Sequence, residues 1–339
     1  MNEQTRTPEA VNGLTSEQLR EKLRKIKCFM LDMDGTFYLG NRILEGSLDF
    51  LDAVEATGRT VLFLTNNSSK SADYYVEKLK RMNVRAPFLN ILTSGQATAR
   101  YCLANFPGKK CFLLGNHILR AEFDKMGVPV DNEHPDYVVI AYDTELDYEK
   151  MTAVCDFVRA GLPYIATHPD YNCPTETGFA PDIGAIIAFI KASTGREPQL
   201  IIGKPYSGIV KDALMVTGLQ PDELAMCGDR LYTDIATGVN FGMTSILVHL
   251  GGSRGKRNQA HPDLRPLGQH DSVSGKNLIA RRAADRKNRG RKHTIVKNVR
   301  HFQRGRAIAA LPRLTFLYHN CILYTSRRGE VFLDVQRQF

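Results

Sequence analysis

The feature that most constrains the fold of this chain is a regular alternation of short apolar segments with helical segments across residues 27–250. Short apolar runs bounded by turn formers are typical of buried β-strands, and the segments between them carry helical apolar spacing. We expect strands at 27–33, 59–68, 90–94, 110–115, 136–143, 163–168, 199–204, 223–229 and 244–250. We expect helices at 15–26, 47–58, 71–82, 95–106, 117–127, 147–161, 182–195, 207–218 and 233–242.

Apolar strands that alternate with helices imply parallel sheets whose two faces are both covered. In open sheets of this kind, ligands bind beyond the carboxyl ends of the strands. Four of the expected strand ends carry the polar sequences DMDGT, TNNS, GKP and GDRLYTD. These four segments are therefore the first place to look for a functional site.

Two acids, Asp32 and Asp34, end the first apolar run. Side chains two positions apart on a strand point the same way, so both carboxyl groups can face one pocket. Gly35 allows the backbone to turn immediately afterwards. Two carboxylates this close repel each other, so the arrangement costs stability unless a cation or a reaction uses it.

Further along the chain, GDRLYTD places Asp229 at another strand end and Asp234 shortly after it. Three or four carboxylates gathered in one pocket need a hard cation, and Mg²⁺ with oxygen ligands fits them. Lys204 adds a positive charge and Thr65 adds a hydroxyl. Acids that hold a metal, together with a lysine and turn amides that can bind oxygens, indicate a phosphoryl site.

In this order, the segments DMDGT, LTNNS, GKP and GDRLYTD resemble the four motifs of the haloacid dehalogenase superfamily. The long insertion between the second and third motifs, and the segment ATHPDYNCPTETGFAPDIGA within it, resemble the NagD-like subgroup of phosphatases. That subgroup includes p-nitrophenyl phosphatases and phosphatases of pyridoxal phosphate, phosphoglycolate and sugar phosphates. The resemblance covers residues 15–250 and implies a Rossmann-like parallel-sheet core with a large inserted α/β cap domain.

The resemblance implies a role for each acid. Asp32 would be the nucleophile that attacks phosphorus and forms an aspartyl-phosphate. Asp34 would protonate the leaving oxygen and then deprotonate the water that hydrolyses the intermediate. Mg²⁺ would be held by Asp32, the backbone carbonyl of Asp34 and Asp229, with Asp234 supporting these ligands.

The resemblance also implies how the phosphoryl group would be bound. Thr65, with the amides of Asn66 and Asn67, would hold the phosphoryl oxygens. Lys204 would neutralise the nucleophile and the charge that develops during the reaction. The acid at position 34 favours phosphate ester chemistry, because the dehalogenases and phosphonatases of the family lack an acid there.

Several of these residues also fit a purely structural interpretation. Asn67 can simply terminate a strand, and Asp234 can be the N-cap of a helix. His168 and Asp170, in the segment THPDYN, fit substrate contacts from the cap as well as a role in shaping the loop. Asp182 fits a helix N-terminal acid better than a substrate contact.

We expect four divisions of the chain. Residues 1–94 form the first part of the core domain, with a short N-terminal helix, and residues 95–195 form the α/β cap. Residues 196–250 form the second part of the core, and residues 251–339 form a basic, irregular tail. A cap excludes water and contacts the part of the substrate beyond the phosphate, so it would set specificity.

The tail differs from the body in charge. Residues 251–339 hold 20 Lys and Arg against 5 Asp and Glu, whereas residues 1–250 hold 25 against 31. Much of the tail has no apolar period and is basic and rich in turn formers, so we expect disorder. Its apolar segment 311–326 is a candidate strand or hairpin. The tail is either a genuine nucleic-acid-binding arm or a frameshifted, non-native segment, and the absence of a nucleic-acid motif favours the second.

The start of the chain is polar, and its seven cysteines are scattered, so we expect a cytoplasmic protein. No apolar run approaches the length of a membrane span, so we expect no membrane partner. A nucleic-acid partner is disfavoured for the reason given for the tail. We expect a Mg²⁺-dependent phosphatase of a small phosphorylated metabolite, with the cap available for homo-oligomer formation. The alternatives are a phosphotransferase that uses the same site and a nucleic-acid-associated protein that uses the tail. The sequence does not identify the phosphate ester.

Overall fold

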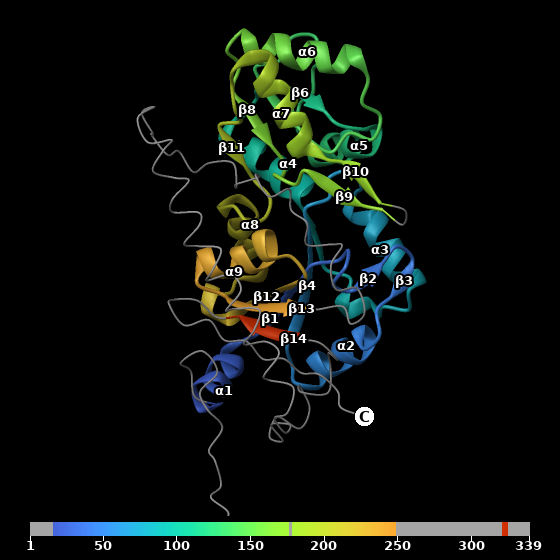
Figure 1. The fold of residues 1–339 in the computed structure, drawn as a ribbon, viewed down its shortest axis with the longest axis vertical. Coiled ribbons are helices and arrows are strands. Elements are labelled where there is room, and N and C mark those ends of the chain that lie inside the picture. Colours follow the sequence, from blue (N-terminus) through green and yellow to red (C-terminus); the bar gives the residue numbers. More distant parts are fainter. Residues whose placement is uncertain (1–15, 176–177, 249–320, 325–339) are drawn as a thin grey trace, which may run out of the picture. The chain divides into compact units, whose positions relative to one another are not determined.

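The computed structural model describes residues 16–175, 178–248 and 321–324 of the 339-residue chain, and these residues form an α/β protein (Figure 1). The helices are α1 (Ser16–Lys25), α2 (Ser47–Ala56), α3 (Ala72–Arg81), α4 (Ser94–Asn105), α5 (His117–Met126), α6 (Tyr148–Arg159), α7 (Ile183–Thr194), α8 (Ser207–Thr217) and α9 (Ala236–Phe241). Each lies within or close to an expected helical segment. The expected helix at 233–242 is divided, because one π-helical turn, η3 (Leu231–Ile235), precedes α9.

The larger sheet has the strand order β14-β13-β12-β1-β4-β5. Its strands are β1 (Cys28–Leu31), β4 (Thr60–Thr65), β5 (Ile91–Thr93), β12 (Leu224–Gly228), β13 (Thr244–Val248) and β14 (Cys321–Tyr324). Within this sheet β14 pairs with β13 in the antiparallel direction, and the other neighbours are parallel. The expected parallel-sheet core is therefore confirmed.

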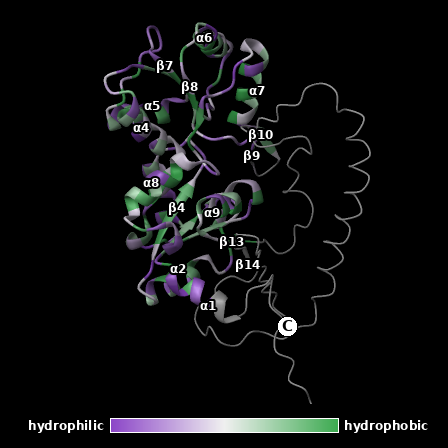
Figure 2. Cartoon of the chain, turned by 90° about the vertical axis from the view of Figure 1, so that its left-hand side faces the viewer, coloured by the Kyte–Doolittle hydropathy of each residue, from purple (hydrophilic) through white to green (hydrophobic). Residues whose placement is uncertain are grey.

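The central strand β1 shows why this sheet needs helices on both faces. All four of its residues are buried. Cys28 and Met30 belong to one hydrophobic cluster, whereas Phe29 and Leu31 belong to another. Because alternate side chains of a strand point to opposite faces, each face of the sheet has its own core. Figure 2 shows the resulting hydrophobic colour along strands such as β4.

The second sheet has the order β11-β8-β7-β6, and its neighbouring strands are parallel. Its strands are β6 (Cys111–Leu114), β7 (Tyr137–Ile140), β8 (Tyr164–Ala166) and β11 (Leu200–Ile201). The division into core and cap stays a prediction. The pairing of β11 with β8 argues for moving the end of the cap from residue 195 to a point after Ile201.

Two short hairpins complete the described strands: β2 (Tyr38–Leu39) pairs with β3 (Arg42–Ile43), and β9 (Asn172–Pro174) pairs with β10 (Phe179–Pro181). Of the expected tail, only β14 falls within the described residues, where it forms the strand suggested by the apolar segment 311–326. The expected disorder of the remaining tail lies outside them. No helix among the described residues is long and apolar enough to span a bilayer.

Candidate active site

The acids of the first and fourth motifs meet because their strands are neighbours. Asp32 follows β1 and Asp229 follows β12, and these two strands pair in parallel with Leu31 opposite Cys227. The backbone N–H of Asp32 continues this ladder by donating to the carbonyl of Cys227 over 2.9 Å. Both carboxylates therefore emerge at the same edge of the sheet, where parallel sheets bind their ligands.

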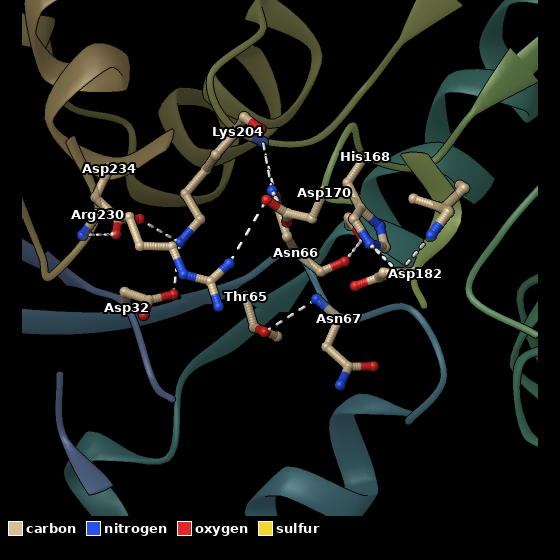
Figure 3. Close-up of polar contacts among 12 residues, drawn as sticks. Asp32, Thr65, Asn66, Asn67, His168, Asp170, Asp182, Lys204, Arg230 and Asp234 are labelled. Carbon is tan, nitrogen blue, oxygen red and sulfur yellow. Dashed lines mark hydrogen bonds and ion pairs between the residues drawn. The ribbon is translucent and has the colours of Figure 1, made fainter. Parts of the chain in front are cut away.

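Asp32, Asp229 and Asp234 form a cluster in which one carboxylate oxygen from each lies within 4.8 Å of the others. Lys204 neutralises part of this charge, because its Nζ lies 2.6 Å from Asp32 Oδ1 and 2.6 Å from Asp234 Oδ1 (Figure 3). The lysine is only 2 % exposed. Burial alone would lower the pKa of Lys204, but the two carboxylates outweigh burial and raise it, so the ammonium stays charged.

The donor set of this cluster fits a divalent cation. Oδ1 of Asp229 is buried and has no hydrogen-bond partner among the described residues. Burial first, and the neighbouring Asp32 second, raise the pKa of Asp229, so its negative charge is under-compensated. Oxygen donors of this kind suit Mg²⁺. Asp32 and Asp229 would hold the ion, and Asp234 would help to orient this cluster through its ion pair with Lys204.

A glycine in each of the two acid motifs makes this close approach possible. Gly35 has a φ of +93°, and a Cβ there would lie 2.7 Å from Asp229 Oδ2. At Gly228, a Cβ would lie 2.2 Å from Asp234 Cγ. Side chains at either position would push the carboxylates away from Asp32. The glycines are therefore part of the geometry of the cluster.

Asp34 stands apart from the carboxylate cluster. The hydroxyl of Tyr38 donates to its Oδ2 over 3.4 Å, and Lys78 Nζ lies 3.7 Å from the centroid of the same tyrosine ring. Burial raises the pKa of Asp34, the charge of Lys78 opposes this, and Asp32 adds to it. A carboxyl group with a raised pKa retains its proton to higher pH, as a general acid must.

Some polar groups of the loop after β4, which the sequence suggested as phosphoryl ligands, form hydrogen bonds within the protein. The backbone N–H of Asn67 donates to Thr65 Oγ1 over 3.1 Å, so the loop is held by its own hydrogen bond. Asn67 Oδ1 accepts from the backbone N–H of Ser69 over 2.9 Å, which fits the structural interpretation of this side chain. The side chain of Asn66 bonds to Lys204 and to Asp170.

His168 and Asp170, the two cap residues proposed from the sequence, are both buried. His168 has no exposed surface, and its ring nitrogens contact Thr167 Oγ1 at 3.1 Å and Asp182 Oδ1 at 3.0 Å. Asp182 is the N-cap of α7, as the sequence favoured. Of the two interpretations left open for His168, the shaping of the loop is the one that these contacts favour.

Sequence reasoning missed two residues near the site: Arg230 and Lys78. Arg230 lies within the quoted segment GDRLYTD, and its Nη1 lies 3.5 Å from Asp170 Oδ1. Burial alone would lower the pKa of Arg230, but Asp170 and the nearby acids raise it. Its position inside a motif was the available signal. Lys78 carries no pattern that marks it.

Sequence comparison matches two parts of the chain to known families. Residues 29–129 match the model described as haloacid dehalogenase-like hydrolase, and residues 201–273 match that of a HAD-like hydrolase. An acid sugar phosphatase of Staphylococcus aureus (strain MRSA252) is 39% identical over 230 residues, which are 68% of this chain and 88% of that protein. The chain belongs to the haloacid dehalogenase-like hydrolases.

Solved structures of similar proteins agree with this membership. A 4-nitrophenylphosphatase from Thermotoga maritima is 46% identical, with a TM-score of 0.66 over 68% of this chain and 89% of that one. A p-nitrophenyl phosphatase from Archaeoglobus fulgidus is 30% identical, with a TM-score of 0.63 over 66% and 86% of the two chains. This haloacid dehalogenase-like hydrolase is therefore an enzyme with the expected α/β fold.

Proposed function

We propose that this enzyme is a Mg²⁺-dependent phosphatase that hydrolyses the monoester of a small phosphorylated metabolite through an aspartyl-phosphate on Asp32. The observation that carries the proposal is the position of Lys204, whose Nζ lies 2.6 Å from both Asp32 and Asp234. The third acid of this cluster, Asp229, has an Oδ1 with no hydrogen-bond partner among the described residues. The similar proteins named above are phosphatases, which supports the same reaction class.

In the first half of the proposed reaction, a carboxylate oxygen of Asp32 attacks phosphorus and the bond from phosphorus to the ester oxygen breaks. The Asp34 carboxyl gives its proton to that leaving oxygen, so an alcohol departs. The ammonium of Lys204 offsets negative charge on Asp32 and on the phosphoryl oxygens. Bound Mg²⁺ would supply further charge stabilisation at the phosphoryl group.

In the second half, the Asp34 carboxylate removes a proton from water, and the resulting hydroxide oxygen attacks phosphorus. The bond between phosphorus and Asp32 breaks, which releases inorganic phosphate and restores the carboxylate. The backbone amides of Asn66 and Asn67 and the Thr65 hydroxyl would bind the phosphoryl oxygens. Asn67 would first have to give up its bond to Thr65.

The substrate would be a sugar phosphate, phosphoglycolate, pyridoxal phosphate or a p-nitrophenyl phosphate-like ester. The acid sugar phosphatase relatives favour the first class for initial trials. The cytoplasmic location and a homo-oligomer formed through the cap remain predictions of the sequence.

Hydrolysis of p-nitrophenyl phosphate, followed with and without EDTA, tests the proposed function. We expect turnover that EDTA abolishes and added Mg²⁺ restores. Asp32→Asn should lose it, because an amide oxygen is a poor nucleophile. Turnover that survives EDTA, or that persists in the Asp32→Asn variant, would rule the proposal out. A phosphate-release screen over the ester classes above would then identify the substrate.

A further inference from the structure

The side chain of Asn66 forms its hydrogen bonds with other groups of the protein. Its Oδ1 accepts from the backbone N–H of Lys204 over 2.8 Å, and its Nδ2 donates to the backbone carbonyl of Lys204 over 3.0 Å. The same Nδ2 donates to Asp170 Oδ2 over 2.9 Å (Figure 3). Asn66 is 7 % exposed. Its amide group therefore holds both the backbone N–H and the backbone carbonyl of Lys204.

The residue before Lys204 is packed just as closely. A Cβ at Gly203 would lie 2.6 Å from Asn66 Oδ1 and 2.7 Å from the carbonyl oxygen of Thr167. Lys204 also follows β11, which belongs to the second sheet, although its Nζ reaches the acids of the first. The placement of this ammonium therefore depends on how residues 167–170 of the cap meet the loop after β4.

Asp170 connects this arrangement to the acidic side of the site. Its Oδ2 accepts from Asn66, and its Oδ1 lies 3.5 Å from Arg230 Nη1. The backbone N–H of Arg230 donates to Asp234 Oδ2 over 3.2 Å. One buried cap carboxylate thus touches both the residue that holds Lys204 and the loop that carries Asp234.

We propose that Asn66 and Asp170 are a positioning pair, which couples the position of the cap on the core to the placement of Lys204 against Asp32. Neither side chain touches the substrate in this role. The pair acts through the backbone of Lys204 on one side and through Arg230 on the other. The catalytic part of this inference rests on the proposed phosphatase function, whereas its structural part does not.

The alternative, in which Asp170 binds substrate from the cap, fits the contacts less well. Asp170 is 5 % exposed, its Oδ2 accepts from Asn66, and its Oδ1, which has no hydrogen bond among the described residues, lies within ion-pair distance of Arg230. The carboxylate of Asp170 would also repel a phosphate ester. Its proximity to Arg230 instead places a counter-charge beside a buried carboxylate, which is the arrangement that a low-dielectric site requires.

The test compares Asn66→Ala, Asp170→Ala and the double variant with the wild-type chain. Glu122→Gln is the matched control, because Glu122 also joins the cap to the core, by accepting from the backbone N–H of Ala72 over 3.1 Å, but contacts neither Lys204 nor Asp32. Two readouts are needed: kcat and KM for p-nitrophenyl phosphate, and hydrogen–deuterium exchange of the backbone amide of Lys204.

We expect each single variant to lower kcat about 10- to 100-fold with little change in KM, as misplacement of a catalytic group by about 1 Å does. The double variant should be no worse than the larger single effect, because the pair acts as one unit. Exchange at Lys204 should become faster in both single variants, and the control should change neither readout.

Three results would overturn the proposal: an unchanged kcat, a rise in KM alone, or unchanged exchange at Lys204 in Asp170→Ala. The two single variants are separate proteins, so if one misfolds the other still decides. If the wild-type chain hydrolyses no phosphate ester, the proposed function fails. The exchange measurement still decides whether Asn66 and Asp170 position Lys204.

Discussion

Lys204 Nζ lies 2.6 Å from Asp32 Oδ1, although 172 positions separate the two residues in the chain. The contact joins a residue that follows the edge strand of the second sheet to one that follows the central strand of the first. It places a charged ammonium, which is itself buried, against the candidate nucleophile. The stability of the fold and the chemistry of the site are therefore linked at this lysine.

Replacement of Lys204 should cost both activity and stability. In Lys204→Met the carboxylates of Asp32 and Asp234 remain close together and buried without a counter-charge. Loss of one partner from a buried ion pair costs about 3–5 kcal/mol of the free energy of unfolding. Urea denaturation in EDTA measures the loss. The control is Lys191→Met, which breaks an exposed pair with Glu197 and should cost no more than about 1 kcal/mol. Equal losses in the two variants would contradict the argument.

Alanine at position 35 should damage the site more than the fold. Gly35→Ala combines a positive φ with a Cβ 2.7 Å from Asp229 Oδ2, so Asp229 must move. We expect kcat for p-nitrophenyl phosphate to fall about 100-fold. Gly58→Ala is the matched control, because Gly58 has a φ of +69° with nothing within 4 Å of its Cβ. It should lose about 1–2 kcal/mol of stability and keep its activity. A Gly35→Ala variant as active as this control would refute the prediction.

Metal binding should be visible without any substrate. Because Mg²⁺ would bind the folded chain through Asp32 and Asp229, it should raise the midpoint of thermal unfolding with a saturable dose response. The stabilisation is about 2.7 kcal/mol at a free ion concentration 100 times the Kd. Asp229→Asn should remove most of this shift, whereas Asp156→Asn, which alters an exposed pair with Arg159, should retain it. A shift of the same size in both variants would place the ion elsewhere.

The stability of the chain should depend on pH through Glu122. Burial, and then the charge of Asp73, raise the pKa of Glu122, while the hydrogen bond from Ala72 and the charges of Lys125 and Arg100 oppose this. The folded state therefore holds this proton more tightly than the unfolded state. The contribution of Glu122 to stability is complete below its unfolded pKa and is lost as pH rises through its folded pKa.

Glu122→Gln keeps an acceptor for the Ala72 N–H but does not titrate. Relative to the wild-type chain, this variant should therefore gain stability as pH rises from the ordinary glutamate range upwards. Urea denaturation of both proteins across that range measures the difference between their free energies of unfolding. A difference that stays constant with pH would show that Glu122 titrates normally.

The sequence predicted the parts of the site that depend on local pattern. Asp32 and Asp229 follow apolar runs, and parallel pairing of those strands is enough to bring the two acids to one edge. Lys204 was placed correctly at a strand end, but periodicity does not say which sheet a strand joins. The membership of β11 in the second sheet could therefore not be predicted.

The sequence could not predict the contacts between distant loops. Asn66 and Asp170 are 104 positions apart, and their pairing depends on how the loop after β8 meets the loop after β4. The pattern of residues around His168 fitted a substrate contact as well as a buried position, because a polar residue after a strand serves either role. Only the packing of Thr167 and Asp182 around its ring distinguishes the two.

The central claim, an aspartyl-phosphate on Asp32, is tested most directly by acid-quenching the enzyme during turnover of a phosphate ester and mapping covalent phosphate by peptide mass spectrometry. The account predicts phosphate on the peptide that contains Asp32, in amounts that fall as substrate is exhausted, and none in Asp32→Asn. Rapid turnover with phosphate on another residue, or undiminished turnover by Asp32→Asn, would contradict it.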